Sequence, residues 1–330
     1  LALIQRKLES ANDTLYLKLS WFGGEPTLAH RKILSFMERI QELQRTNNMV
    51  VTSVLVTNGY LLTLPLFRSF LDAGITEYQV TLDGDRETHD RLRVLKNGRP
   101  TFDRIYRNLL DISRGIPKDT DFKMSIRANF LRTRVDSMER LLDRFASDFA
   151  KDARFQIYFR PVYYFETTRD DIESVAPEIC SFREGMDIQL DLAIKTMKRL
   201  NRTDFVRVFD PLPRPTYTWC GVEQKNTFII GADGALFACD SLITRDEDNI
   251  GFIGRIRHDG SLELNERAAL WKSSVFNQPD NHDCIECKLL PICLGGCPRQ
   301  RHTNSRPGFW TEEDILEAMR LYGDLHFPER

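Results

Sequence analysis

The feature that most constrains the fold is a regular alternation of strand-like and helix-like segments in the first half of the chain. The strand-like segments mix continuous apolar runs with β-branched and aromatic residues, and they span residues 14–21, 50–56, 77–82, 122–130 and 154–159. Helical apolar spacing occupies residues 31–44, 64–73, 102–112 and 137–149. This alternation predicts an α/β fold with a parallel sheet, either closed into a barrel or open and doubly wound. In both cases we expect the active site at the carboxyl ends of the strands.

The start of the chain reads as an incomplete repeat. Residues 1–10 form a helical pattern with no strand before it, and the first residue is Leu1 rather than Met. An upstream strand would give six strand–helix units in place of five. We therefore expect six strand–helix units whose first strand is missing, with the true N-terminus upstream of Leu1.

The alternation stops near Arg160, and residues 170–200 read as one or two helices. A proline-rich stretch at residues 210–215 has the composition of a linker. We place the domain boundary there, which predicts a barrel domain over residues 1–210 and a second domain over residues 211–330.

The second domain has its own structural signals. Residues 227–238 predict two short strands around Ala-Asp-Gly, a good hairpin sequence. Residues 312–322 predict a final helix, with Thr311 and Asp314 placed as a capping box.

Cysteines are concentrated late in the chain: six of the seven lie between Cys220 and Cys297. One late cluster in a large chain favours metal binding over a disulfide framework. The sharpest pattern, C-x2-C-x5-C-x3-C, comprises Cys284, Cys287, Cys293 and Cys297. Its spacing alone fits structural zinc as well as iron–sulfur clusters. The remaining cysteine, Cys180, is expected to be a buried small hydrophobic residue within a helix.

Polar, glycine-bearing segments follow three of the predicted strands. They are Gly23-Gly24-Glu25-Pro26, Thr57-Asn58-Gly59 and Thr81-Leu82-Asp83-Gly84. Two glycines let a ligand lie against the backbone, and the next carboxylate can hold an ammonium group. Taken alone, the first segment is better explained as a tight turn with a glutamate at a helix start. Because the ends of parallel strands share one rim, the three segments together predict a small-molecule site.

Composition argues against other classes of protein. Lys and Arg number 46, Asp and Glu 48, and the formal net charge is −2. A nearly neutral chain has no strong field to attract nucleic acid or an anionic membrane. No apolar run reaches the roughly 18 residues of a membrane span, and no basic-then-apolar leader begins the chain. We expect no nucleic-acid or membrane partner.

Together the motifs resemble the radical S-adenosylmethionine (SAM) enzymes that carry a C-terminal SPASM domain, and the resemblance covers nearly the whole chain. Residues 23–26 are similar to the family's GGEP motif, which binds the SAM methionine amino group, and residues 81–93 (TLDGDRETHDRLR) to its strand-four segment. Cys220-x13-Gly234-x4-Cys239, followed by the four-cysteine pattern, matches the SPASM array. The resemblance implies an enzyme of the α/β class, with a partial (β/α)6 radical SAM barrel whose first strand is missing and a C-terminal cysteine-rich SPASM domain.

Carried over position by position, the resemblance implies SAM and two auxiliary [4Fe–4S] clusters as cofactors. Cys220, Cys239 and Cys297 would ligate the first cluster, and Cys284, Cys287 and Cys293 the second. The SAM site would be lined by Gly23, Gly24, Glu25, Pro26, Thr57, Asn58 and Thr81. Arg127, in the following strand, could meet the SAM carboxylate or serve only as an ion-pair partner.

The sequence departs from the family in two places. The CxxxCxxC loop that holds the SAM-cleaving cluster is expected on a segment upstream of Leu1; the opposing interpretation is a degenerate protein that cannot cleave SAM. The final SPASM cysteine, expected beyond Cys297, has no counterpart. The second auxiliary cluster would then have an open iron, a place for substrate, or another ligand such as His302.

The resemblance also implies a mechanism. A reduced cluster splits SAM into methionine and a 5′-deoxyadenosyl radical, which takes a hydrogen atom from an unactivated C–H bond. The auxiliary clusters can accept the electron that the substrate radical loses. In the similar sulfatase-maturating enzymes an aspartate at the place of Asp240 takes the substrate proton; the plainer alternative is an aspartate that caps a turn.

The implied substrate is a peptide or protein side chain. We expect a thioether or carbon–carbon cross-link in a ribosomally made peptide, with formylglycine formation in a sulfatase, or a non-catalytic iron–sulfur or zinc module, as alternatives. Residues 160–165 (RPVYYF) could bind the peptide or pack in the core. A reductant such as flavodoxin or ferredoxin is an expected partner, and oxygen-sensitive clusters imply the cytoplasm.

Overall fold

The computed structural model of the protein describes residues 1–162, 176–201, 215, 218, 220–244, 246–272, 282–302, 312–313, 315–316 and 319–320. The chain forms two compact units. One is Asn12–Asp210, and the other combines Leu1–Ala11 with Pro211–Arg330. The two units meet in sequence at the predicted boundary, but Leu1–Ala11, which we predicted to lie with the barrel, clusters with the C-terminal unit.

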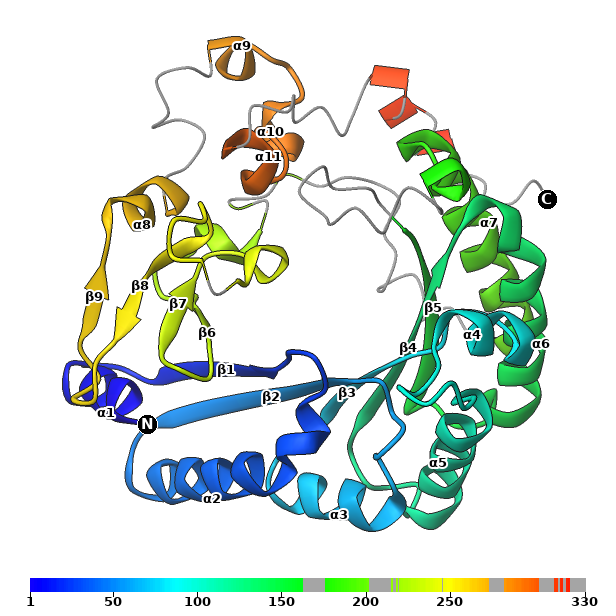
Figure 1. Cartoon of the computed structure of the whole chain (residues 1–330), viewed down its shortest axis with the longest axis horizontal. Coiled ribbons are helices and arrows are strands. Elements are labelled where there is room, and N and C mark those ends of the chain that lie inside the picture. Colours follow the sequence, from blue (N-terminus) through cyan, green and yellow to red (C-terminus); the bar gives the residue numbers. More distant parts are fainter. Residues whose placement is uncertain are drawn as a thin grey trace. The chain divides into compact units, whose positions relative to one another are not determined.

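The larger unit is built on a parallel sheet (Figure 1). Its strands are β1 (Leu15–Trp21), β2 (Met49–Thr57), β3 (Glu77–Thr81), β4 (Lys123–Phe130) and β5 (Phe155–Pro161). They are hydrogen-bonded in the order β1-β2-β3-β4-β5, and every neighbouring pair is parallel. A doubly wound sheet reverses its strand order at a switch point. The sequential order therefore selects the barrel from the two predicted alternatives.

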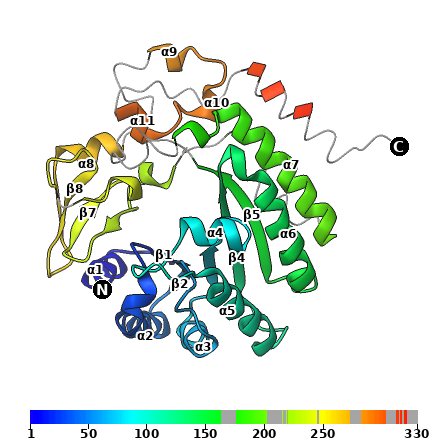
Figure 2. The same ribbon diagram turned by 45° about the vertical axis from the view of Figure 1, so that its right-hand side comes forward.

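Helices connect the strands and cover one face of this sheet (Figure 2). They are α2 (His30–Thr46), α3 (Leu64–Asp72), α4 (Arg86–Leu92), α5 (Phe102–Gly115) and α6 (Val135–Phe149). All but the short α4 were predicted. On α5, Phe102, Ile105, Tyr106 and Leu109 are all buried. This spacing of i, i+3, i+4 and i+7 forms the apolar stripe by which a helix packs on a sheet.

The two faces of the sheet differ in chemistry. On β4, the residues that face the helices, from Met124 to Phe130 at every second position, are buried, and those between them are half-buried. Strand register continues this second face onto the neighbouring strands. We call it the polar sheet face, and it comprises Gln79, Thr81, Ser125, Arg127, Asn129, Gln156 and Tyr158.

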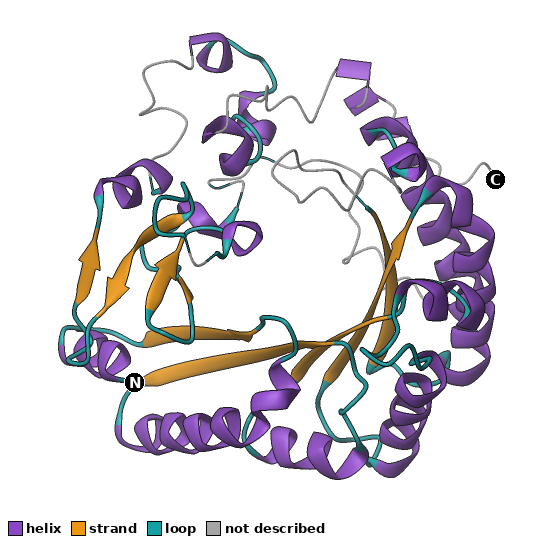
Figure 3. Ribbon diagram, viewed as in Figure 1, coloured by secondary structure: helices purple, strands orange, loops and turns teal. Residues whose placement is uncertain are grey.

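The C-terminal unit contains an antiparallel sheet (Figure 3). Its order is β6 (Ile229–Ile230), β7 (Ala235–Phe237), β8 (Phe252–Ile256) and β9 (Leu262–Leu264). The predicted hairpin is confirmed as β6–β7, with Gly234 at φ 82° in its turn. Short helices follow, namely α8 (Glu266–Trp271), α9 (His282–Ile285), α10 (Leu290–Cys293) and α11 (Pro298–His302).

Polar contacts explain why the first helix belongs to the C-terminal unit. In α1 (Ala2–Glu9), Arg6 forms an ion pair with Asp259 at 3.6 Å, and Lys7 donates a hydrogen bond to Asn226 at 3.1 Å. Gly260 lies so close to this helix that a Cβ there would approach the backbone of Ala2 to 2.4 Å.

The helix predicted within residues 170–200 begins later than expected. α7 (Phe182–Leu200) starts after Ser181, whose side chain forms a capping box with Glu184. Cys180 therefore precedes the helix rather than lying in it, and its burial in the apolar core is confirmed. The predicted cap residues Thr311 and Asp314, and residues 163–165 of the aromatic stretch, lie outside the described residues. None of the described helices is long and apolar enough to cross a membrane.

Candidate functional site

The carboxylate of Glu25 links the carboxyl ends of β1 and β2. Its Oε1 accepts hydrogen bonds from the Thr57 hydroxyl at 2.6 Å and from the backbone N–H of Thr27 at 3.0 Å, and the Thr27 hydroxyl donates to the same atom. Its Oε2 accepts from the backbone N–H of Asn58 at 2.7 Å. We predicted that this carboxylate would face an ammonium group, yet much of its capacity is taken by donors of the chain itself. Only its remaining lone pairs are available to a ligand.

Glycines shape both strand ends. Gly23 has φ 140°, a backbone conformation that side chains disfavour, and it is exposed next to Gly24. Gly59 has φ 78°, and a Cβ at this position would lie 2.7 Å from the Val80 side chain. The Gly59 carbonyl also accepts a hydrogen bond from Asn108 at 2.9 Å. Glycine at position 59 thus lets β2 end close against β3. Pro26, buried, opens the short 3-10 helix η1 (Pro26–Ala29) that follows the first pair.

A chain of polar contacts reaches Arg127 from the interior. Asp83 is 6% exposed and pairs with Arg93. Its Oδ1 accepts from the side-chain amide of Asn129 at 2.9 Å and from the Asn129 backbone N–H at 3.1 Å. The Oδ1 of Asn129 in turn accepts from Nε of Arg127 at 2.9 Å. Thr81 lies opposite Arg127 in the strand register.

His89 anchors the segment after β3 from a fully buried position. Its Nδ1 accepts the backbone N–H of Asp83 at 3.1 Å. Its Nε2 lies 3.1 Å from the hydroxyl of Thr101, which donates its own proton to the Arg93 carbonyl at 2.6 Å. Nε2 therefore carries the proton, and the ring is neutral. Burial lowers the pKa of His89 from 6.5 to about 4.

The polar sheet face extends beyond the predicted residues. The Tyr158 hydroxyl donates to Gln79 at 2.6 Å, and Tyr158 lies opposite Arg127 on β5. Burial raises the pKa of Tyr158, an effect that Arg127 and Arg160 partly oppose. Sequence reasoning missed Gln79, Asn129 and Tyr158. The available signal was their alternation with apolar residues along the strands, which is visible only once the helix-facing side is known.

The structure thus places the residues predicted to bind SAM at the carboxyl ends of β1, β2 and β3, with Arg127 within β4 opposite the end of β3. Glu25, Thr57 and Asn58 are joined by hydrogen bonds, and Thr81 and Arg127 are register partners. Backbone N–H groups, hydroxyls and a guanidinium line this rim. Such groups can hold a polar, charged small molecule.

The predicted cluster ligands and Asp240 lie in the C-terminal unit, and all of these cysteines are free thiols. Burial is the main cause that raises the pKa of the Cys239 thiol, and the nearby Cys297 contributes. Burial likewise raises the pKa of Cys293, with contributions from Cys284 and Cys287. The cysteines that interact electrostatically are thus Cys239 with Cys297, and Cys293 with Cys284 and Cys287.

The immediate surroundings of Cys239 and Cys220 are polar. The thiol of Cys239 lies 3.0 Å from the Ser241 hydroxyl and 3.7 Å from Oδ1 of Asp240, which is exposed. The backbone N–H of Cys220 donates to Glu223 at 3.3 Å. The side chain of Lys272 lies close enough to Cys220 to interact with it electrostatically.

Within the described part of the chain, no group of three or more His, Cys, Asp or Glu side chains is arranged to hold a single metal ion. A [4Fe–4S] cluster requires a different arrangement, because each iron takes its own thiolate and the ligands surround a larger body. The side chain of His302, the predicted alternative ligand, lies outside the described residues.

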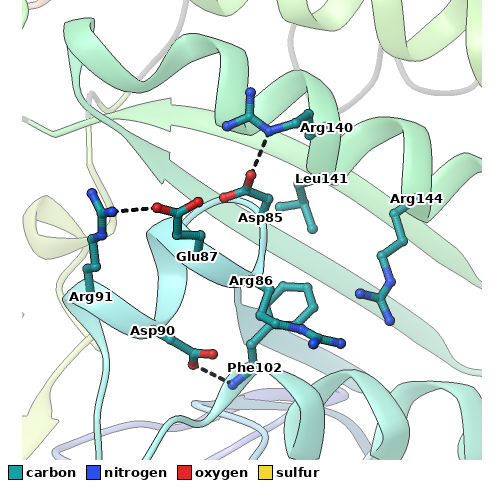
Figure 4. Close-up of a pocket in the computed structure, with 9 residues that line it drawn as sticks. All are labelled: Asp85, Arg86, Glu87, Asp90, Arg91, Phe102, Arg140, Leu141 and Arg144. Carbon is teal, nitrogen blue, oxygen red and sulfur yellow. Dashed lines mark hydrogen bonds and ion pairs between the residues drawn. The ribbon is translucent and has the colours of Figure 1, made fainter.

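A cavity of about 580 Å³ opens among α4, α5 and α6 (Figure 4). Its lining is charged and includes Asp85, Arg86, Glu87, Asp90, Arg91, Arg140 and Arg144. Most of these charges are paired within the chain: Arg140 with Asp85 at 2.6 Å, Arg91 with Glu87, and Arg86 with Asp103 at 2.8 Å. None of the predicted site residues lines this cavity, and we assign it no function.

Comparison with known proteins identifies relatives along nearly the whole chain. No family model matches. A cysteine-type anaerobic sulfatase-maturating enzyme of Clostridium perfringens is 25% identical over 312 residues, which cover 91% of this chain and 78% of the relative. The same kind of enzyme from Clostridium novyi is 26% identical over 315 residues (89% and 76%). A serine-type enzyme of Klebsiella aerogenes is 24% identical over 303 residues (84% and 65%).

Solved structures share the fold. The structure of anSMEcpe with bound AdoMet matches with a TM-score of 0.60 and 19% identity, covering 99% of this chain and 86% of that chain. Streptococcus suis SuiB bound to S-adenosylmethionine matches with a TM-score of 0.52 and 15% identity, covering 94% and 68%. Sequence relatives and shared fold together confirm the resemblance found in the motifs: the chain is a homologue of the radical SAM/SPASM enzymes.

Proposed function

We propose that this protein is a radical SAM enzyme that abstracts a hydrogen atom from a side chain of a peptide or protein. The observation that carries the proposal is the polar rim at the carboxyl ends of β1–β4. There Glu25, Thr57 and Asn58 are hydrogen-bonded together and Arg127 is fixed by Asn129. The rim belongs to a barrel fold shared with two proteins whose structures contain AdoMet.

The rim offers complementary groups for the methionyl part of SAM. The exposed backbone at Gly23 and Gly24, with the free lone pairs of Glu25, would accept the ammonium group. The guanidinium of Arg127 would pair with the carboxylate, because its terminal nitrogens lie beyond the Nε that Asn129 holds. SAM, when bound beside a reduced iron–sulfur cluster, supplies the 5′-deoxyadenosyl radical.

We assign two auxiliary clusters to the C-terminal unit. Cys220, Cys239 and Cys297 would hold the first, and Cys284, Cys287 and Cys293 the second. Two observations support these groups: the electrostatic neighbours Cys239–Cys297 and Cys284–Cys287–Cys293, and the Gly295–Gly296 turn after Cys293, where both residues have positive φ. Such clusters supply an electron acceptor. Asp240, an exposed carboxylate beside Cys239, would take the proton that leaves the substrate.

Two products are consistent with this chemistry. The sequence relatives are named as cysteine-type and serine-type sulfatase-maturating enzymes, which favours oxidation of a Cys or Ser side chain to formylglycine. The SPASM resemblance favours a thioether or carbon–carbon cross-link in a ribosomal peptide. Formylglycine carries an aldehyde that reacts with hydroxylamine, whereas a cross-link does not. Treatment of the product with hydroxylamine therefore distinguishes formylglycine from a cross-link.

The test uses the full-length protein, purified without oxygen. We expect bound iron and sulfide, binding of SAM, and 5′-deoxyadenosine formation when a reductant and a Cys- or Ser-containing peptide are added. Cys287→Ala should lower the iron content, whereas the matched control Cys180→Ala, at a buried cysteine outside both groups, should not. Zinc in place of iron, together with no affinity for SAM, would refute the proposal and favour a non-catalytic metal module.

A further inference from the structure

A buried arginine follows Cys297, one of the three cysteines proposed to hold the first auxiliary cluster, by four residues. The side chain of Arg301 in α11 is 1% exposed and pairs through Nη2 with Glu223, whose side chain is 7% exposed. Among the described residues, its Nε and Nη1 have no hydrogen-bond partner. A buried N–H without an acceptor costs about 1–3 kcal/mol, and more when the group is charged. These N–H donors require a hydrogen-bond acceptor, and an anionic acceptor also balances the positive charge of the guanidinium.

Backbone and side-chain contacts connect Arg301 to the segments of two of those cysteines. The backbone N–H of Arg301 donates to the Cys297 carbonyl at 3.1 Å, one helical turn away. The carboxylate of Glu223, which pairs with Arg301, also accepts the backbone N–H of Cys220 at 3.3 Å. Arg301 and Glu223 thus connect the segments that carry Cys220 and Cys297.

The third cysteine has a buried arginine of its own nearby. Arg299 is 4% exposed, and its Nη1 donates to the Ser241 hydroxyl at 3.3 Å. That hydroxyl lies 3.0 Å from the thiol of Cys239. Buried arginines are thus connected to the segments of all three cysteines, whose thiolates carry negative charge when they ligate iron.

We propose that Arg301 donates its two unpartnered N–H groups to the anionic cluster held by Cys220, Cys239 and Cys297, and that the Arg301–Glu223 pair sets the reduction potential of that cluster. This inference rests on the proposed function. Arg301 would contact the cluster rather than the substrate. Hydrogen bonds and charge around cluster sulfur are among the determinants of cluster potential.

The sign of each effect follows from charge. Reduction adds an electron to the cluster, and a nearby guanidinium stabilises the added negative charge, so Arg301 raises the potential. The carboxylate of Glu223 has the opposite sign and lowers it. A purely structural pair would not give shifts of opposite direction, since removal of either partner would then only weaken the fold.

The test is a redox titration of the anaerobic full-length protein, followed by electron paramagnetic resonance. We expect Arg301→Gln to shift one cluster signal to lower potential and Glu223→Gln to shift the same signal to higher potential. The double variant Arg301→Gln/Glu223→Gln should return close to the wild-type value. The second cluster should not move in any of them. The matched control Arg257→Gln, which removes an exposed arginine paired with Glu263 in the same unit, should leave both signals unchanged.

The iron content and the thermal unfolding of each variant are measured as well. They distinguish a change in cluster potential from misfolding and from the absence of clusters. Arg301→Lys keeps the charge and tests the hydrogen bonds if Arg301→Gln does not fold; we expect a smaller shift of the same sign. Wild-type protein without iron would refute the proposed function. This inference would be overturned if the wild type holds two clusters and the variants fold and bind iron, but neither cluster potential shifts. It would also be overturned if both single variants shift the potential in the same direction.

Discussion

The side-chain amide of Asn129 donates a hydrogen bond to the buried carboxylate of Asp83 at 2.9 Å. Since Asn129 also accepts from Nε of Arg127, the acid fixes the arginine two steps away. We expect Asn129→Ala to weaken SAM binding about tenfold, the scale of one hydrogen bond to a charged group. Affinity for 5′-methylthioadenosine, which lacks the carboxylate, should not change. Calorimetry with both ligands measures the difference, and Asn97→Ala, in an exposed turn, is the control.

Glu25 provides a second test at the same rim. In Glu25→Gln an amide group replaces one carboxylate oxygen, so that a donor faces either the Asn58 N–H or the Thr57 hydroxyl. We expect faster hydrogen exchange at the Asn58 amide and a loss of about 1–3 kcal/mol in local stability. The control Glu38→Gln changes an exposed glutamate on α2 and should leave that amide protected. Equal exchange in the two variants would contradict the link between β1 and β2.

His89 makes the stability of the barrel unit depend on pH. Its pKa is about 4 in the folded protein and 6.5 when unfolded, so that between these values the unfolded chain binds a proton that the folded chain does not. Stability is therefore lost as the pH falls through this window. We expect a loss of about 2 kcal/mol between about pH 7 and about pH 5.

Hydrogen exchange of α4 and α5 at the two pH values measures this loss. His89→Gln should be less stable at neutral pH but should show a smaller loss on acidification. His258→Gln, which changes an exposed histidine, should behave as the wild type. An identical pH dependence in His89→Gln and wild type would assign the effect to other groups.

Asp240 is predicted to act after SAM cleavage. In Asp240→Asn the side chain can no longer accept a proton, so 5′-deoxyadenosine should still form while product is lost. Mass spectrometry of the peptide and chromatography of the nucleoside, on one reaction, give both quantities. Asp246→Asn, at an exposed aspartate in the following loop, should retain product formation. Full turnover in Asp240→Asn would remove the assignment.

Most strands and helices of the barrel could be predicted from the sequence, because their apolar residues follow simple periodicities. The helix over residues 102–112 was predicted from apolar spacing, and the same positions are buried in α5. The short α4 was missed because its residues Arg86–Leu92 carry almost no apolar stripe. Polar interactions hold it instead: Asp85 caps its first turn, and His89 bonds back to Asp83.

The rim was predicted in position but not in detail. Glycines and polar residues at strand ends mark a rim, because every parallel strand ends on the same side. Which groups then bond to one another depends on register and on side-chain direction. For this reason the four hydrogen bonds to Glu25 and the contact between Asn129 and Arg127 could not be read from the sequence. The buried pair Arg301–Glu223 joins residues 78 positions apart, which no local pattern reveals.

The tight exit of β2 at Gly59 makes the rim sensitive to a single methyl group. With Val80 2.7 Å from where a Cβ would stand, an alanine here has no room and would also strain the backbone at φ 78°. The chain would have to bulge away from β3, and the Asn58 N–H would swing away from Glu25 with it. The geometry of this rim thus depends on a position that carries no side chain at all.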